Sequence, residues 1–335
     1  MKCQVSIDWL TFTVRSDNPD DVIRDFLGMD PDLFQLTGLS LMGFHKVKKF
    51  SDINVCWEGR EDTHFHLSSL VCVSMSGNGC RAFETFSKLS PDKQTSPFLP
   101  LFNKLMSDDN IHVTRIDIAC DDRDGVLDMD LMAAKVREGA VNTRLTSRDI
   151  HQKFCGEAND GMTIYIGSPS SDFRLRIYDK AKEQGIEGHW VRVEMVLRAE
   201  HSRAFVSQVA SGEDVGTLAA KVLNEKFLFI ERDDTNISRC SVCVWWSAFV
   251  QEVEAVKLVA RCVIQHAVER IDSWVSSQVG PSLYILAHTM GLHRLYEISQ
   301  SAADRLSRKQ EALIADFNSL CFANAQNSPQ LSAAT

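Results

Sequence analysis

The sequence predicts an α+β fold, in which a largely antiparallel sheet with flanking helices is followed by a helical subdomain. Segments rich in β-branched and aromatic residues alternate with helical segments through the first two thirds of the chain. Two of the strand segments are joined by the short polar loop 168–172 (SPSSD), which is typical of a β-hairpin. From about Trp245 onward, apolar residues recur at helical spacing instead.

Each element is predicted from its local pattern. The strand candidates alternate or cluster Val, Ile, Phe and Thr, and in chain order they are Val5–Val14, Phe44–Val55, Phe65–Met75, His112–Asp121, Met162–Gly167, Phe173–Tyr178 and Trp190–Arg198. The helical candidates have apolar residues three and four positions apart, and they are Asp20–Leu27, Arg81–Met106 with interruptions at Pro91 and Pro97, and Asp128–Glu138.

The pattern divides the chain into three parts. Helical spacing runs from Trp245 to Phe322, with breaks at Gly280-Pro281 and at Gly291, and the stretch before it is polar. We therefore expect an α+β domain over residues 1–230, a helical subdomain over 240–323 and a flexible tail over 324–335. No internal sequence repeat is found.

Composition narrows the class of protein. Hydrophobic residues make up 44% of the 335 residues, which excludes a disordered chain, and no run of about 18 apolar residues predicts a membrane span. The N-terminus lacks the pattern of a signal peptide, so the ten cysteines are interpreted as reduced core thiols and the location as cytoplasmic. The net charge of −9 argues against a protein that coats nucleic acid, although eight aspartates between residues 107 and 130 account for much of it.

The segment Val113–Asp122 (VTRIDIACDD) is the first candidate for chemistry. Side chains alternate along a strand, so Arg115, Asp117 and Asp121 share one face. Two carboxylates on one face offer the oxygen ligands that Mg²⁺ and Mn²⁺ prefer. The alternative is an ion pair between Asp117 and Arg115 or Arg192, with Asp121 and Asp122 in a turn.

The segment Phe173–Lys180 (FRLRIYDK) is the second. Arg174, Arg176 and Tyr178 share one face by the period of two, and Lys180 follows. A phenol has a pKa near 10, so a nucleophilic tyrosine needs nearby cations or a base. The alternative is a tyrosine that only packs at a strand end with its hydroxyl in water.

Two further segments carry weaker patterns. Val191–Arg198 (VRVEMVLR) alternates charged and apolar residues, which is typical of a half-solvated strand, but Glu194 could add a third carboxylate to the site of Asp117. In Thr63–Leu67 (THFHL), His64 and His66 share one face as metal ligands would. The sequence has no P-loop, no dinucleotide-binding glycine motif and no G-x-S-x-G motif, which removes support for NTPases, dehydrogenases and serine hydrolases.

Taken in order, these segments resemble the replication initiation factor family, the rolling-circle initiators of staphylococcal-type plasmids and of filamentous phages related to the cholera-toxin phage. The resemblance covers about residues 7 to 205. Its matching stretches are Ile7–Val14 (IDWLTFTV), Ser76–Glu84 (SGNGCRAFE), Val113–Asp122, Gly161–Glu183 (GMTIYIGSPSSDFRLRIYDKAKE) and Trp190–Arg198 (WVRVEMVLR).

The resemblance implies a site-specific DNA nickase and ligase. The family's nucleophile corresponds to Tyr178, which would attack a phosphodiester at the origin and form a covalent 5′-phosphotyrosine. Asp117 and Glu194 match the family's acidic positions, with Asp121 as a third ligand for Mg²⁺ or Mn²⁺ and with His64 and His66 as alternative ligands. Charge on the phosphate or the phenolate would be offset by Arg176, Lys180 and Arg192.

Several partners are expected. The resemblance implies origin DNA that is locally single-stranded at the nick, together with a host helicase and polymerase. The local positive charge predicts that Arg144, Arg148 and Lys153, with Arg174, contact the DNA. Helical periodicity alone predicts that the C-terminal segment supports a homodimer or binds origin duplex. Two alternatives remain open: a DNA-binding phage or plasmid regulator without nicking activity on the same scaffold, and a metal-dependent nuclease that uses water.

Overall fold

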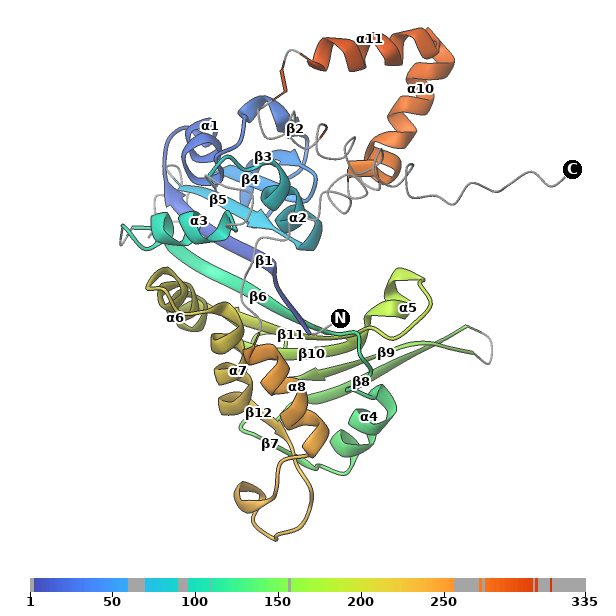
Figure 1. Ribbon diagram of the computed structural model, residues 1–335. Helices are drawn as coiled ribbons and strands as arrows, with labels where there is room; N and C mark the ends of the chain where they lie inside the picture. The colour runs from blue at the N-terminus through green and yellow to red at the C-terminus, as the bar shows by residue number, and fades with distance from the viewer. Residues whose placement is uncertain are drawn as a thin grey trace, which may run out of the picture.

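A long antiparallel sheet runs through the computed structural model (Figure 1). The structure describes residues 3–59, 70–89, 96–108, 110–155, 158–255, 271–272, 275–303, 305–306 and 314. Within them, ten strands lie in the order β2-β3-β4-β5-β1-β6-β11-β10-β9-β8, and all neighbours are antiparallel. The predicted α+β class with a largely antiparallel sheet is confirmed.

Strands occur at the predicted segments, although the strands at residues 35–37 and 148–155 were not predicted, and residues 65–69 of the candidate Phe65–Met75 lie outside the described residues. The strands of the large sheet are β1 (Gln4–Arg15), β2 (Gln35–Thr37), β3 (Phe44–Phe50), β4 (Ile53–Gly59), β5 (Leu70–Met75), β6 (His112–Asp122), β8 (Arg148–Cys155), β9 (Ala158–Ile166), β10 (Phe173–Asp179) and β11 (Val191–Arg198). The candidate Phe44–Val55 spans two strands because Ser51, at φ 51°, turns the chain between β3 and β4. The predicted hairpin is β9–β10. Outside this sheet, β7 (Val141–Thr143) pairs with β12 (Phe227–Phe229).

The two halves of the large sheet repeat one topology. In the first half, β1 is followed by the meander β2-β3-β4-β5, whose last strand returns to pair with β1. In the second half, β6 is followed by β8-β9-β10-β11, whose last strand returns to pair with β6. The halves meet where β1 pairs with β6. A repeat that the sequence analysis did not detect is therefore present in the fold, and residues 71–75 (VCVSM) occupy in β5 the place of residues 191–195 (VRVEM) in β11.

Helices make up most of the remaining regular structure of the described residues, and several of them pack against strands of the sheet. They are α1 (Pro19–Val22) with η1 (Ile23–Leu27), η2 (Pro31–Leu33), α2 (Gly77–Phe86), α3 (Phe98–Leu105), α4 (Met129–Arg137), α5 (Lys180–Gln184), α6 (Ala199–Ala210), α7 (Val215–Lys226), η4 (Ile237–Arg239), α8 (Val244–Glu254), η5 (Val275–Val279), α10 (Gly280–Met290) and α11 (Leu292–Ala303). Aspartates begin several of them, since Asp128, Asp179 and Asp214 each accept a backbone N–H of the first turn.

Helix α8 belongs to the main core. Trp246 and Phe249 of α8 are fully buried, and Trp246 contacts Phe227 and Phe229 with ring centroids 5.7 and 5.1 Å apart. This helix lies in the expected helical subdomain, yet it packs against α7 in the same hydrophobic cluster as the sheet. The division of the chain at residues 230–240 stays a prediction, and the expected tail over 324–335 lies outside the described residues.

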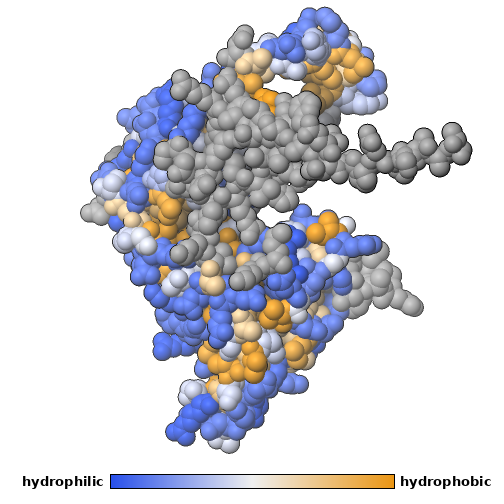
Figure 2. All heavy atoms as spheres, viewed as in Figure 1, coloured by the Kyte–Doolittle hydropathy of each residue, from blue (hydrophilic) through white to orange (hydrophobic). Residues whose placement is uncertain are grey.

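Helices α10 and α11 contact each other and expose apolar side chains, which Figure 2 shows on their surface. Tyr284, Ile285 and Leu292 are each more than half exposed. Gly291 separates the two helices as expected, whereas Pro281 stands at the first turn of α10 rather than interrupting a helix. No helix in the described part of the chain is long and apolar enough to cross a membrane.

The seven cysteines whose side chains the structure describes are free and buried, as expected for core thiols.

Gly79, in the segment Ser76–Glu84 and near the start of α2, lies against the turn between β3 and β4. A Cβ atom at this position would stand 2.3 Å from the carbonyl oxygen of Asp52. The glycine therefore allows α2 to pack closely on the sheet.

Replacing Gly79 by alanine should destabilise the protein by about 1–3 kcal/mol, because a backbone carbonyl cannot move aside as a side chain can. Chemical denaturation monitored by circular dichroism measures this change. Gly38→Ala is the matched control, since a Cβ atom at that position would meet no other atom within 4 Å. Equal stability of the two variants would contradict the close approach of α2.

Candidate functional site

The candidate site lies on the face of β6, β11 and β10 that faces away from the apolar core. These strands are neighbours, and their register places Tyr178 opposite Arg192 and Arg176 opposite Glu194. On the other side of β11, Arg192 lies opposite Asp121. Residues from three sequence segments are thus brought together because each segment alternates polar and apolar side chains.

Tyr178 ends β10 with its ring packed among charged groups. It is only 3% exposed, and its hydroxyl donates a hydrogen bond to Oε2 of Glu194 at 3.3 Å. The guanidinium of Arg176 lies 4.0 Å from the ring centroid, and Nζ of Lys180 lies 5.5 Å from it. Burial, together with the neighbouring Glu194, holds the pKa of Tyr178 well above its usual range, so the phenol carries its proton at neutral pH.

Glu194 is the carboxylate that receives this hydrogen bond. Burial raises its pKa to about 7, and the neighbouring Asp117 and Asp8 add to the rise. Arg176 opposes the rise, with Nη1 3.6 Å from Oε2 of Glu194. A carboxylate that is about half protonated near pH 7 is suited to exchange a proton with a phenol.

Arg192 is held from two sides by carboxylates. Its Nε and Nη2 donate to the two oxygens of Asp121 at 2.6 and 2.9 Å, and its Nη1 lies 3.1 Å from Oδ1 of Asp8. Although burial opposes it, this pairing with Asp121 keeps the pKa of Arg192 above its usual range. Arg192 is therefore a fixed positive charge directly opposite Tyr178.

Asp117 forms the ion pair that the sequence left open as an alternative. Arg115 donates to both of its oxygens, at 2.9 and 2.5 Å. Burial nevertheless raises the pKa of Asp117. Among the described residues, no three His, Cys, Asp or Glu side chains are placed to hold a metal ion together. Asp117, Asp121 and Glu194 therefore stay predicted metal ligands, and His64 and His66 lie outside the described residues.

Sequence reasoning missed two members of the site. Asp8, in the first half of the sheet, reaches Arg192 of the second half, and its signal was a lone charge in the apolar run IDWLTFTV. Glu183 on α5 forms ion pairs with Lys180 and, at 3.4 Å, with Arg176. Glu183 stands one helical turn after Lys180, a spacing that could have indicated it.

The residues predicted to contact DNA divide into two groups. Arg144, Arg148 and Lys153 are exposed, and the last two lie on β8, an edge strand of the sheet. Arg174 instead lies half-buried on β10, with its guanidinium 4.1 Å from the ring centroid of Tyr165. Only Arg174 shares the strand and the face of Tyr178.

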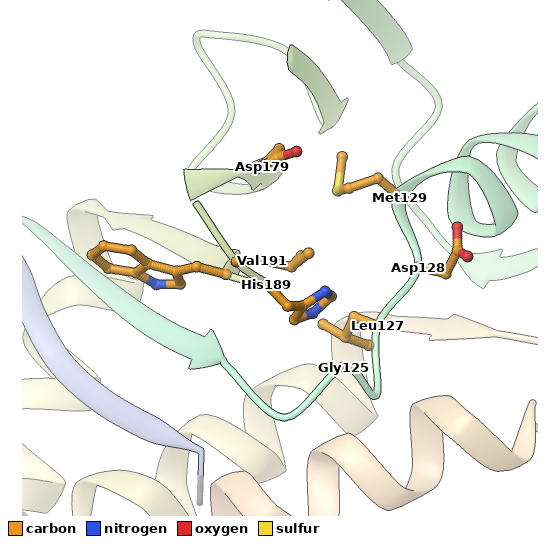
Figure 3. A pocket seen from close by; sticks show the side chains of 9 residues that line it. Gly125, Leu127, Asp128, Met129, Asp179, His189 and Val191 are labelled. Carbon is orange, nitrogen blue, oxygen red and sulfur yellow. The ribbon is translucent and has the colours of Figure 1, made fainter. Parts of the chain in front are cut away.

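A cavity of about 230 Å³ opens where β10 ends and β11 begins (Figure 3). Asp179, which follows Tyr178, lines it together with Asp128, Met129 and His189. His189 is held there because its Nε2 lies 2.9 Å from Oδ2 of Asp122.

Comparisons with known proteins agree with this architecture. Residues 111–302 match the family model described as replication initiation factor. Residues 4–99 match the model described as rolling circle replication initiation protein N-terminal domain. The two matched ranges correspond approximately to the two halves of the sheet.

One relative and one solved structure extend the comparison. The chain is 24% identical to the putative DNA relaxase NicK of Bacillus subtilis (strain 168) over 291 residues, which cover 83% of this chain and 79% of that protein. The fold is similar to that of a rolling circle replication initiator protein from Geobacillus stearothermophilus. That similarity has a TM-score of 0.67 at 23% identity and covers 76% of this chain and 98% of the other.

The raised pKa of Glu194 predicts a pH-dependent stability. Above pH 4.5 the unfolded chain releases a proton that the folded protein keeps until about pH 7, so the charged carboxylate opposes folding increasingly through this window. In metal-free buffer, Glu194→Gln should stabilise the protein by about 1–3 kcal/mol at pH 8, and this gain should vanish near pH 4.

Denaturation midpoints measured from pH 4 to pH 8 test this expectation. The exposed Glu187 offers a matched control, Glu187→Gln, which should change stability little at any pH. A destabilised Glu194→Gln variant at pH 8 would show that the charged form is favoured in the fold.

Proposed function

Because the chain belongs to the replication initiation factor family, we propose that it initiates rolling-circle replication by nicking and rejoining one DNA strand at an origin. The observation that carries this proposal is the hydrogen bond from Tyr178 to Glu194 among fixed cations. It pairs a nucleophile with a proton acceptor, which covalent catalysis requires.

In the proposed reaction, Oη of Tyr178 attacks a phosphodiester while its proton passes to Glu194. The new bond joins the tyrosine oxygen to the phosphorus, and the bond to the 3′ oxygen breaks. A 5′-phosphotyrosine and a free 3′-OH result, with the proton that the 3′ oxygen needs available from the protonated Glu194. The reverse sequence rejoins the strand, because the covalent link conserves the energy of the phosphodiester.

Cations of the site would stabilise the charge that develops on the phosphate. Arg176 and Lys180 both lie over the ring of Tyr178, and Glu183 orients them from α5. Arg192 is fixed by Asp121 and would act from the opposite strand. Since Tyr178 is almost fully buried, DNA binding must first uncover its hydroxyl.

We include a divalent cation, Mg²⁺ or Mn²⁺, in the proposal. Its chemistry would polarise the phosphate, and carboxylate oxygens are the ligands these ions prefer. Asp117, Glu194 and Asp121 supply such oxygens, but Arg115 and Arg192 occupy those of the two aspartates. As they stand these side chains do not form a metal site, so no step is assigned to the ion.

The partners follow from the proposed reaction. The substrate is origin DNA that is single-stranded at the nick, with Arg144, Arg148, Lys153 and Arg174 as backbone contacts. A host polymerase would extend the free 3′-OH and a host helicase would unwind the duplex, both in the cytoplasm. The apolar surfaces of α10 and α11 are candidates for a homodimer contact.

Replacing Tyr178 by phenylalanine should abolish covalent capture of DNA, with nicking reduced by roughly 10³-fold or more, because the variant lacks the attacking oxygen. The assay incubates the protein with Mg²⁺ and single-stranded circular DNA carrying the replicon's origin, followed by a denaturing gel. Tyr296→Phe is the control, since Tyr296 is exposed on α11.

Each alternative outcome has a distinct meaning. Nicked DNA without a covalent band would favour a water-using nuclease. DNA binding without nicking in the wild-type protein would favour a regulator.

Removal of divalent cations with EDTA should abolish the covalent adduct, and added Mg²⁺ or Mn²⁺ should restore it. The adduct band is quantified over a titration of each metal. Adduct formation that is unchanged in EDTA would contradict metal assistance and assign all charge compensation to the arginines and Lys180.

A further inference from the structure

Three arginines gather on the face of Tyr178, toward the other end of the same strands. Arg115 on β6 lies directly opposite Arg198 on β11. Arg174 on β10 lies opposite Val196, one diagonal step from Arg198. At about 3.3 Å per residue, Arg174 is ~13 Å along β10 from Tyr178. We call Arg115, Arg174 and Arg198 the arginine cluster.

The arginine cluster has more positive charge than its surroundings neutralise. Asp117 pairs with Arg115 through Nε and Nη2, which leaves Nη1 of Arg115 available. Neither Arg174 nor Arg198 forms an ion pair with a described carboxylate, and Arg198 instead donates to the carbonyl oxygen of Ser171 at 3.0 Å. Burial and the adjacent Arg115 lower the pKa of Arg198, and Arg174 contributes to that shift, whereas the carboxylates of Asp117 and Asp172 oppose it. Like charges placed directly opposite on a sheet are destabilising unless an anion joins them.

The interior of the arginine cluster contains an unused donor. Nε of Arg174 is buried and has no hydrogen-bond acceptor among the described residues. A buried donor without a partner carries a desolvation cost, so an acceptor is expected there. The unpaired Nε of Arg174 and the excess positive charge are separate observations, and both favour binding of an anion at the arginine cluster.

Two of the guanidinium groups lie over aromatic rings. Arg115 lies 4.2 Å from the ring centroid of Trp9, and Arg174 lies 4.1 Å from that of Tyr165. Trp9 is fixed because its Nε1 donates to Oγ1 of Thr11 at 2.7 Å. His151 packs edge-on against Tyr165 with centroids 5.3 Å apart. Cations alternating with aromatic rings are typical of surfaces that bind single-stranded nucleic acid.

We propose that the arginine cluster binds a backbone phosphate of the same DNA strand that Tyr178 cuts, but not the phosphate that is cut. The separation of ~13 Å from Tyr178 is too long for a single phosphate to contact both. A phosphate oxygen would accept from the guanidinium groups and compensate their charge. The strand would then lie along β10, with a second anchor that sets which phosphate reaches the tyrosine. This inference rests on the proposed function and adds a positioning site to it.

The test measures binding of the full-length protein to a fluorescent 20-nucleotide oligo(dT) at several salt concentrations. A protein loses a slope of about 0.7 in log Kd against log salt for each phosphate contact removed from a single strand. The variant Arg174→Gln/Arg198→Gln should show this loss and bind roughly tenfold more weakly at 0.1 M salt. Arg174→Lys/Arg198→Lys should keep most of the slope, since it keeps the charge.

A matched control removes the same charge elsewhere. Arg24 and Arg239 are exposed on η1 and η4, so Arg24→Gln/Arg239→Gln should leave the salt slope unchanged. An unchanged slope in the arginine-cluster variant, or an equal loss in the control, would overturn the proposal.

A second measurement on the wild-type protein does not depend on variants that fold. Phenylglyoxal modifies accessible arginines, and mass spectrometry locates the modified residues. Oligo(dT) should protect Arg174 and Arg198 but leave Arg24 reactive, whereas equal modification with and without oligo(dT) would overturn the proposal. Because neither experiment requires strand cleavage, a failed covalent-capture assay would reject the proposed function separately.

Discussion

The site depends on one constraint: charged side chains buried on a sheet must be paired. Asp117, Asp121 and Arg192 are each less than a tenth exposed, and arginine–carboxylate pairs with two hydrogen bonds satisfy the two aspartates. Glu194 is equally buried but has no such dedicated partner, so its pKa rises and it accepts the hydroxyl proton of Tyr178 in a hydrogen bond. Tyr178 and Glu194 therefore pair with each other because arginines already neutralise the neighbouring Asp117 and Asp121.

The repeated topology determines which half of the sheet carries these charges. Where β11 has Arg192 and Glu194, the equivalent positions of β5 have Cys72 and Ser74. Cys72 there joins an apolar cluster with Phe44, Val47 and Cys56. The first half nevertheless contributes Asp8 to Arg192 across the central strands. The second half of the sheet thus carries the polar site. The first half packs beside it and contributes the carboxylate of Asp8.

A net charge of −9 is compatible with a DNA-binding face because much of the acid is used locally. Asp117 and Asp121 are paired with arginines. Asp122 accepts the backbone N–H groups of Asp124 and Leu127, which shapes the turn after β6. Arginines therefore neutralise two of the eight aspartates in the acidic block, and net charge alone says little about which surface attracts a phosphate backbone.

The sequence by itself determined the fold class, most strand positions, and the face that carries Tyr178, because the period of two needs only local residues. It also placed Asp117 and Glu194 near one another through family resemblance. Only the tertiary structure decided that Asp8 joins Arg192, that Arg115 takes Asp117, and that α8 packs in the core, since these contacts depend on strand order and register across residues far apart in the chain. The sequence could not predict the two repeated halves for the same reason, because the repeat lies in the order of the strands.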